Sequence, residues 1–213
     1  MREKRILIAD VSHHQKDNVI SALMQTGIEC VIIRRGYMSL NGLRPDCKFE
    51  KFYKEAKKGG MSVGTYFYIY DSTRKIAPER AARKIYDMLL DYEFDMPVFL
   101  DIEDFPTDDK VHCQDWTEAC LNALERYVLF VGIYGSDINT FKDMFADGKA
   151  LTKRYYSWVA RYGRDPQYIV NPDMHQFTDE GKLNSYNGRV DLSYMYRDVR
   201  ETIIKGGFNG NGL

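Results

Sequence analysis

The sequence predicts an α/β fold, specifically a TIM-like barrel of the modified (β/α)5(β)3 type. Along the 213 residues, short apolar strands and amphipathic helices alternate about five times, and three further strands follow with little helix between them. Such alternation is typical of a parallel sheet, because each helix returns the chain to the start of the next strand. Eight strands in a chain of this length favour a barrel. The competing arrangement is an open doubly wound sheet, and the glycine patterns of its nucleotide-binding versions are absent.

Each expected strand is a short apolar run, often rich in β-branched or aromatic residues. The runs are Ile6–Val11, Cys30–Arg34, Ser62–Tyr70, Pro97–Asp104, Phe130–Tyr134, Tyr155–Ala160, Asp173–Thr178 and Val190–Tyr194. The expected helices have apolar residues three and four apart and start at capping residues or at a first-turn proline. They follow Asp17 and Pro78 and cover Asp46–Lys58, Trp116–Val128, Asp137–Phe145 and Arg197–Lys205.

This pattern predicts one barrel domain over residues 1–205, of the kind that carries active sites, and a glycine-rich tail or linker over residues 206–213. Hydrophobic residues make up 44% and charged residues 29% of the chain, as in an ordinary globular protein. The four cysteines lack metal-site and C-x-x-C spacing, so we expect free thiols.

The charge balance excludes several partner classes. With a formal net charge of -1, nothing in the composition calls for nucleic acid or an anionic membrane. No apolar run is long enough to span a bilayer, and the run after the charged N-terminus is too short for a signal-peptide core. We therefore expect neither nucleic-acid binding nor membrane insertion, and the sequence indicates no export route.

The fourth expected strand ends in a pair of acids, Asp101 and Glu103. Side chains alternate along a strand, so the two point the same way, about 6.6 Å apart at about 3.3 Å per residue, whereas Asp104 points to the other face. Two acids on one face of a buried strand are costly to desolvate. They suit chemistry that needs one protonated and one ionised carboxyl group, although a solvated strand end is the simpler interpretation.

In barrels, active residues lie at the C-terminal ends of strands. The ends of the expected strands, in order, supply Asp10, Arg35 and Tyr37, Tyr66, Asp101 and Glu103, Tyr134, Trp158, Gln176 and Asp191. Four carboxylates and several aromatic rings at one opening suit glycoside hydrolysis. They also suit a divalent metal site, as in a phosphodiesterase-type barrel, or a glycan-binding barrel without turnover.

Six segments of the chain resemble glycoside hydrolase family 25, the Chalaropsis-type lysozymes of phage endolysins and bacterial autolysins. They are A-D-V-S-H-H-Q (Ala9–Gln15), V-I-I-R-R-G-Y (Val31–Tyr37), G-T-Y-F-Y (Gly64–Tyr68), P-V-F-L-D-I-E (Pro97–Glu103), Y-S-W-V-A-R-Y (Tyr156–Tyr162) and H-Q-F-T with V-D-L-S (His175–Thr178, Val190–Ser193). Together they cover essentially the whole chain in the family's order.

The resemblance implies a barrel of five strand–helix units plus three strands. It also implies cleavage of the β-1,4 bond between N-acetylmuramic acid and N-acetylglucosamine in bacterial peptidoglycan. Glu103 matches the general acid, and Asp10, Asp101 and Asp191 match the other active-site carboxylates. Groove contacts are expected from Tyr66, Tyr134, Trp158, Gln176, Arg35 and Tyr37. The resemblance implies no cofactor and no metal, and we expect a monomer that acts on the cell wall.

Overall fold

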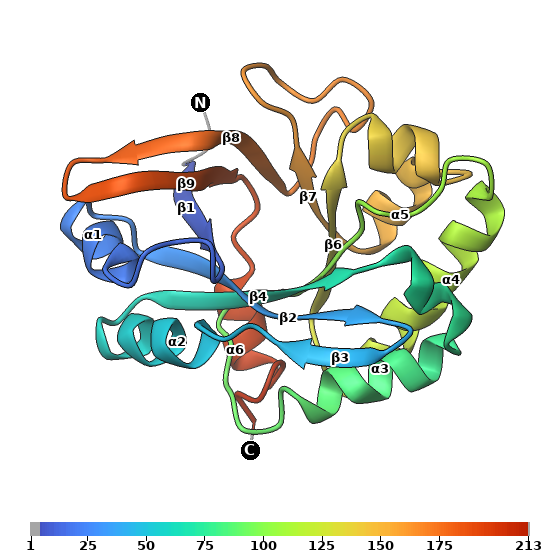
Figure 1. The fold of residues 1–213 in the computed structure, drawn as a ribbon, viewed down its shortest axis with the longest axis horizontal. Coiled ribbons are helices and arrows are strands. Elements are labelled where there is room, and N and C mark those ends of the chain that lie inside the picture. Colours follow the sequence, from blue (N-terminus) through green and yellow to red (C-terminus); the bar gives the residue numbers. More distant parts are fainter. Residues whose placement is uncertain (1–4, 213) are drawn as a thin grey trace.

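The computed structural model describes residues 5–212 and contains one nine-stranded sheet (Figure 1). The strands are β1 (Ile6–Val11), β2 (Cys30–Ser39), β3 (Gly42–Pro45), β4 (Ser62–Ile69), β5 (Val98–Asp101), β6 (Val131–Ser136), β7 (Tyr156–Ala160), β8 (Met174–Leu183) and β9 (Tyr186–Met195). Leaving out β3, which only extends β2, the other eight close into a barrel because β1 pairs with both β2 and β9. Residues 1–4 of the expected barrel and Leu213 of the expected tail lie outside the described part.

The barrel confirms the predicted fold. The barrel strands β1, β2 and β4 to β8 pair in parallel around the ring. Among the barrel strands, β9 alone runs antiparallel to both of its neighbours. The first five strand–helix units are followed by β7, β8 and β9, which no helix separates, and Figure 1 shows the β8–β9 hairpin extending without helical cover.

The helices are α1 (Val19–Gln25), α2 (Phe49–Lys58), α3 (Pro78–Asp87), α4 (Lys110–Glu125), α5 (Gly148–Arg154) and α6 (Arg200–Lys205). Two short segments, the 3-10 helix η1 (Asp71–Lys75) and the π-helix η2 (Asn139–Met144), complete the set. In α3, Pro78 opens the first turn and Ala81, Ala82 and Ile85 form the buried face, as their spacing predicts. Within residues 5–212, no helix is long and apolar enough to cross a bilayer.

One predicted helix differs from the structure. The sequence suggests a single helix over Asp137–Phe145, with Asp137 as its cap, but the structure has η2 followed by α5. The carboxylate of Asp137 instead accepts hydrogen bonds from the backbone amides of residues 167–169 and from Arg161. The cap of α5 is Asp147, which accepts from the amide of Ala150 at 3.0 Å.

Alternating side chains divide the apolar core into two layers. One layer lies between strands and helices and includes Val31, Val63 and Leu100. The other fills the barrel, with Ile8, Ile32, Phe99, Trp158, Met174 and Met195 among its members. Val199 and Ile203 of the α6 region belong to this inner layer, so the C-terminal helix closes the base of the barrel and leaves the opposite end open.

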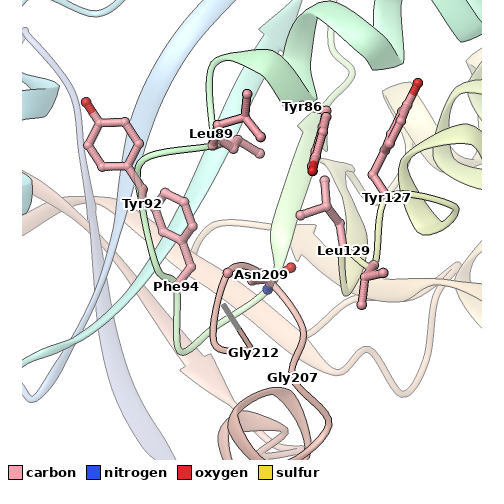
Figure 2. Close-up of a pocket in the computed structure, with 12 residues that line it drawn as sticks. Tyr86, Leu89, Tyr92, Phe94, Tyr127, Leu129, Gly207, Asn209 and Gly212 are labelled. Carbon is pink, nitrogen blue, oxygen red and sulfur yellow. The ribbon is translucent and has the colours of Figure 1, made fainter.

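The glycine-rich segment after α6 packs against the protein, which differs from the expected linker or disordered end. Figure 2 shows its turn, from Gly207 to Gly212, beside an apolar cavity of about 240 Å³. The lining includes Leu89, Phe94, Leu129 and the stacked rings of Tyr86 and Tyr127. The segment is fixed by Asn209, whose side chain accepts from the amide of Phe130 at 2.8 Å and donates to the carbonyl of Met96 at 2.9 Å. Glycine here serves a tight turn rather than a free chain.

Candidate active site

Four carboxyl groups gather at the open end of the barrel, where the parallel strands finish. Asp101 is the last residue of β5, and Glu103 follows two residues later. Asp10 on β1 is paired in register with Asp191 on β9. The side chains form two pairs of adjacent acids, Asp101 with Glu103 and Asp10 with Asp191, in which the negative charge of one acid opposes ionisation of the other.

The surroundings favour the protonated forms of these acids. Burial, followed by the charge of Glu103, raises the pKa of Asp101 well above its usual range, and burial raises the pKa of Glu103. Burial and the charge of Asp191 raise the pKa of Asp10 in the same way, and burial raises the pKa of Asp191 to about 6. Asp101 is only 4% exposed, whereas Glu103 is exposed at the opening.

A buried amide joins Asp10 to two tyrosine hydroxyls. The side-chain nitrogen of Gln176 on β8 donates to Asp10 Oδ2 at 2.9 Å. Its oxygen accepts from the hydroxyls of Tyr134 at 2.7 Å and Tyr162 at 3.0 Å. Tyr134 on β6 lines the same cleft as Glu103. A chain of hydrogen bonds therefore runs from Asp10 through Gln176 to the hydroxyls of Tyr134 and Tyr162.

Aromatic rings support this cluster from below. Trp158 on β7 is 1% exposed, and its ring lies 4.4 Å from that of Tyr134 and edge-on to Tyr66 and Phe99. Its indole nitrogen donates to the buried hydroxyl of Ser193 at 3.0 Å. Trp158 and Gln176, expected as groove contacts, thus form a floor beneath the acids.

The two other expected groove residues, Tyr37 and Arg35, lie in different parts of the structure. Tyr37 lies at the rim, where its ring meets Tyr70 edge-on. Arg35 is not brought to the opening, because its guanidinium stacks on Phe49 and Tyr92 and donates to the carbonyl of Met88 at 3.2 Å. A β-bulge between residues 34 and 36 shifts the register of β2.

Arg34 points into the barrel in place of Arg35. It is paired in register with Tyr66 and forms a 2.9 Å ion pair with Asp46, whose carboxylate is fully buried. Asp46 is also held by the backbone amides of His13 and Lys48. The charge of Arg34 lowers the pKa of Asp101, opposing the larger effects of burial and Glu103.

A cleft of about 470 Å³ opens beside Glu103. Its lining includes Tyr134, Asn139, Arg161, Tyr162 and Arg164, from the ends of β6 and β7 and the segments that follow them. An elongated ligand in this cleft would meet Glu103 before any other acid of the cluster, since Asp101 lies deeper. Within residues 5–212, no group of three or more His, Cys, Asp or Glu side chains has the arrangement of a metal site. All four cysteines are free, as expected.

Sequence reasoning missed Arg34, Tyr162, Ser193 and Thr140, whose hydroxyl donates to the carbonyl of Ile102 at 2.9 Å, between the two acids of the β5 end. The alternation of side chains along a strand could have identified two of them. Arg34 lies two residues after Ile32, and Ser193 lies two residues after Asp191, so both face the inside of the barrel. Tyr162 lies beyond β7 and Thr140 lies in a π-helix, and neither position has a periodic pattern to identify it.

Comparison with known proteins places the chain in a family. A family model described as Glycosyl hydrolases family 25 matches residues 9–186. An autolytic lysozyme of Clostridium acetobutylicum is 23% identical over 203 residues, covering 93% of this chain and 57% of its own length. The spore cortex lytic enzyme SleM of Clostridium perfringens has a TM-score of 0.76 at 22% identity over 90% of this chain and 67% of SleM. The bacterial lysozyme of Streptomyces coelicolor has a TM-score of 0.73 at 18% identity over 98% of both chains.

This chain therefore spans little more than half the length of the curated relative, but it contains a complete barrel of the kind seen in these structures. The match over residues 9–186 runs from the second half of β1 through β8 and includes the acids Asp10, Asp101 and Glu103. On this basis, the chain belongs to the Glycosyl hydrolases family 25.

Proposed function

We propose that this protein is a muramidase that cleaves the β-1,4 bond between N-acetylmuramic acid and N-acetylglucosamine in bacterial peptidoglycan. Relatives described as an autolytic lysozyme and a spore cortex lytic enzyme support this substrate class. The observation that carries the proposal is the pair of adjacent acids Asp101 and Glu103 at the open end of the barrel, with Glu103 lining the cleft. We further propose that the protein acts on the cell wall as a monomer, without a cofactor.

Glu103 acts as the general acid. It is exposed at the opening and can reach a glycosidic oxygen in the cleft, whereas Asp101 is buried behind it. Desolvation by the surrounding protein raises its pKa above the usual range of a glutamate, which favours the protonated form that a general acid needs. As the bond between the anomeric carbon and the bridging oxygen breaks, the proton of Glu103 passes to that oxygen. A water molecule then adds its hydroxyl to the anomeric carbon and returns a proton to Glu103.

Asp101 stabilises the positive charge that develops at the anomeric carbon. Its Oδ1 atom is buried and has no hydrogen-bond partner among residues 5–212, so it is available to a substrate group.

The lower layer of the site holds these groups in place. Asp10, Asp191 and Gln176 set the charge and hydrogen bonding behind the pair. Tyr66, Tyr134 and Trp158 form its aromatic wall and floor, and Tyr37 and Tyr162 extend the wall toward the solvent. Among the residues expected to contact substrate, Arg35 stays apart from this wall, and we propose no contact for it.

The test is the release of new reducing ends from purified peptidoglycan by the wild-type protein, Glu103→Gln and Asp101→Asn. The wild type should release them in the presence of EDTA, and both variants should lose at least about a hundredfold in rate, because acid catalysis and charge stabilisation each contribute at this level. Circular dichroism and thermal melting of each variant show whether the fold is intact. Comparable rates in Glu103→Gln and the wild type would overturn the assignment, and binding without new reducing ends would indicate a glycan-binding barrel.

A further inference from the structure

We propose that Arg164 is a specificity-determining residue, which binds a carboxylate carried by the side group of an N-acetylmuramic acid unit in the cleft. This inference rests on the proposed function and deepens it, because it names the part of the peptidoglycan strand that the cleft recognises. In such a strand N-acetylglucosamine is neutral. The charge comes from carboxylates on the 3-O-lactyl group of N-acetylmuramic acid or on the peptide attached to that group.

Two of the four charged side chains in the cleft neutralise each other. The charged lining consists of Glu103, Asp137, Arg161 and Arg164. Arg161 donates to Asp137 Oδ2 at 2.6 Å and to Gln167 Oε1 at 2.9 Å. Asp137 is only 1% exposed and also accepts hydrogen bonds from backbone amides of the loop after β7. Asp137 and Arg161 are therefore committed to each other and to this loop.

Arg164 differs because its charge is not compensated. Its side chain is exposed, and its guanidinium has no hydrogen bond or ion pair with any of residues 5–212. The neighbouring acid, Asp165, lines a different groove together with Arg5 and Tyr196. Because burial raises the pKa of Glu103 and favours its neutral form, Arg164 gives the cleft a net positive charge. A carboxylate suits this group, since the planar guanidinium can donate two parallel hydrogen bonds to it.

The backbone that carries Arg164 is held to the barrel although its side chain is free. The amides of Arg161 and Gly163 donate to carbonyls of β8 at 3.0 and 3.1 Å. The Nε2 atom of His175, a residue that is 3% exposed, donates to the carbonyl of Arg161 at 2.8 Å. Gly163 has a left-handed φ of 69°, which glycine adopts readily. The turn thus presents Arg164 from a fixed base, which reduces the ordering that a bound ligand must impose.

The chemistry of the proposed substrate brings a carboxylate to this cleft. N-acetylmuramic acid supplies the anomeric carbon of the bond that Glu103 protonates, and the lactyl group is attached to carbon 3 of the same ring. The side group therefore leaves the ring close to the cleft that Glu103 and Arg164 both line. N-acetylglucosamine at this position would offer only a hydroxyl. Arg164 would thus favour peptidoglycan over an uncharged glycan such as chitin.

Four soluble substrates test the proposal. Glycan strands freed of peptide by an amidase carry the free lactyl carboxylate, and strands with intact peptides carry only the peptide carboxylates. Each is compared with the same material after its carboxylates have been converted to methylamides. The measured quantity is the ratio of kcat/KM on the charged strand to kcat/KM on its neutral counterpart. Any general effect of a variant on folding or on the chemical step cancels in this ratio.

Arg164→Gln should lower the ratio by about threefold to tenfold, the range expected for one charged contact at an exposed site. Arg164→Lys should keep part of the ratio, and Arg164→Glu should lower it further. The loss should fall on KM rather than on kcat, because this contact is equally strong in the ground state and the transition state. Raising the ionic strength from about 0.01 M to about 1 M should remove most of the difference, since the screening length falls from about 30 Å to about 3 Å.

Arg126→Gln is the matched control. Arg126 is also exposed, and its guanidinium has no ion pair with any of residues 5–212. It lies between α4 and the start of β6, at the end of the barrel remote from the cleft. The ratio should therefore stay at the wild-type value in this variant.

The two pairs of substrates identify the source of the carboxylate. A loss in Arg164→Gln on the peptide-free pair identifies the lactyl group, and a loss on the peptide-bearing pair alone identifies the peptide. Wild-type ratios in Arg164→Gln on both pairs, or an equal loss in Arg126→Gln, would overturn the proposal. Failure of the proposed function is a different result, in which the wild type releases no reducing ends from any of the four substrates. Calorimetric binding of the same strands to Glu103→Gln, with and without Arg164→Gln, still decides the role of Arg164 in that case.

Discussion

Asp10 and Asp191 lie opposite each other on the antiparallel strands β1 and β9, and the charge of Asp191 raises the pKa of Asp10. This contact lies at the seam where the last strand closes the barrel onto the first. Closing the ring therefore forces two acids together, and the fold carries the electrostatic cost of its own site. Such a cost is common where a site has been shaped for chemistry rather than stability.

Asp191→Asn should make the protein more stable at neutral pH while reducing its activity. Burial raises the pKa of Asp191 from 3.8 to about 6, so the folded state binds its proton more tightly than the unfolded state does. The free energy of unfolding then falls as the pH rises through that window and stays lower above it. We expect a gain of about 1–2 kcal/mol for Asp191→Asn at pH 7 that shrinks toward zero below about pH 4. Urea unfolding of both proteins at pH 7 and below pH 4 measures this gain. An equal difference in the free energy of unfolding at the two pH values would show that the raised pKa of Asp191 is not its cause.

Thr140→Val should slow the reaction with little change in binding. The backbone of Ile102, between Asp101 and Glu103, donates to the carbonyl of Tyr134 at 3.0 Å and accepts from the Thr140 hydroxyl at 2.9 Å. Losing the second bond frees the peptide that sets the spacing of the acids. We expect kcat to fall by about tenfold to a hundredfold with KM nearly unchanged.

Two variants show whether this effect arises from the hydroxyl of Thr140. Thr140→Ser keeps the hydroxyl and should retain most of the rate. Thr117→Val removes a similar buried bond, from Thr117 to the carbonyl of Cys113 at 2.7 Å on α4, and should leave kcat unchanged. Equal losses of kcat in Thr117→Val and Thr140→Val would point to a general loss of stability instead.

Arg34→Gln and Arg35→Gln should have different effects although the two residues are adjacent. Arg34 opposes the negative charge around Asp101, so its loss should lower kcat/KM by about tenfold, since one opposite charge typically shifts a carboxyl pKa by a unit or more. Arg35 packs on Phe49 and Tyr92 behind the barrel, so its loss should lower the melting temperature and leave kcat/KM close to the wild-type value. Steady-state kinetics and thermal melting of both variants separate the outcomes, and Arg34→Lys tests whether charge alone suffices. A loss of activity in Arg35→Gln as large as in Arg34→Gln would contradict the prediction that only Arg34 acts on the site.

Asn209→Ala should destabilise the protein by about 2–3 kcal/mol without affecting the chemistry. The side chain of Asn209 satisfies the buried amide of Phe130 and the carbonyl of Met96, and its backbone has a left-handed φ of 56°. Asn209→Gly keeps the backbone conformation and loses only the side-chain bonds, so it should cost less than Asn209→Ala. Denaturant unfolding ranks the three proteins, and equal stability of all three would show that the segment is not anchored.

The sequence allowed the strands to be predicted because each is a local pattern. A run such as Val98–Asp101 is identified by its own residues. The eight barrel strands and the five helical connections are found by applying the same criterion along the chain. Asp10 and Asp101 could be predicted for the same reason, since they stand at the ends of β1 and β5, whereas Asp191 lies in the middle of β9.

What the sequence did not reveal depends on contacts between distant residues. A one-residue bulge decides that Arg34 rather than Arg35 faces the site, and no local signal distinguishes the two arginines. The glycine-rich end resembles a linker, and bonds to residues far away in the sequence hold it to the protein, among them those of the Asn209 side chain to Met96 and Phe130. Strand ends likewise did not show that Trp158 and Gln176 lie one layer below the rim, because depth in a barrel depends on the stagger of neighbouring strands.

The proposed role of Glu103 is to donate the proton that breaks the β-1,4 bond between N-acetylmuramic acid and N-acetylglucosamine. Its most direct test is to digest purified peptidoglycan, reduce the new ends with borohydride and identify the reduced sugar by mass spectrometry. The wild-type protein should give fragments that end in reduced N-acetylmuramic acid, and Glu103→Gln, folded to the same extent, should give none above background. Fragments that end in reduced N-acetylglucosamine, or equal yields from the two proteins, would contradict the claim.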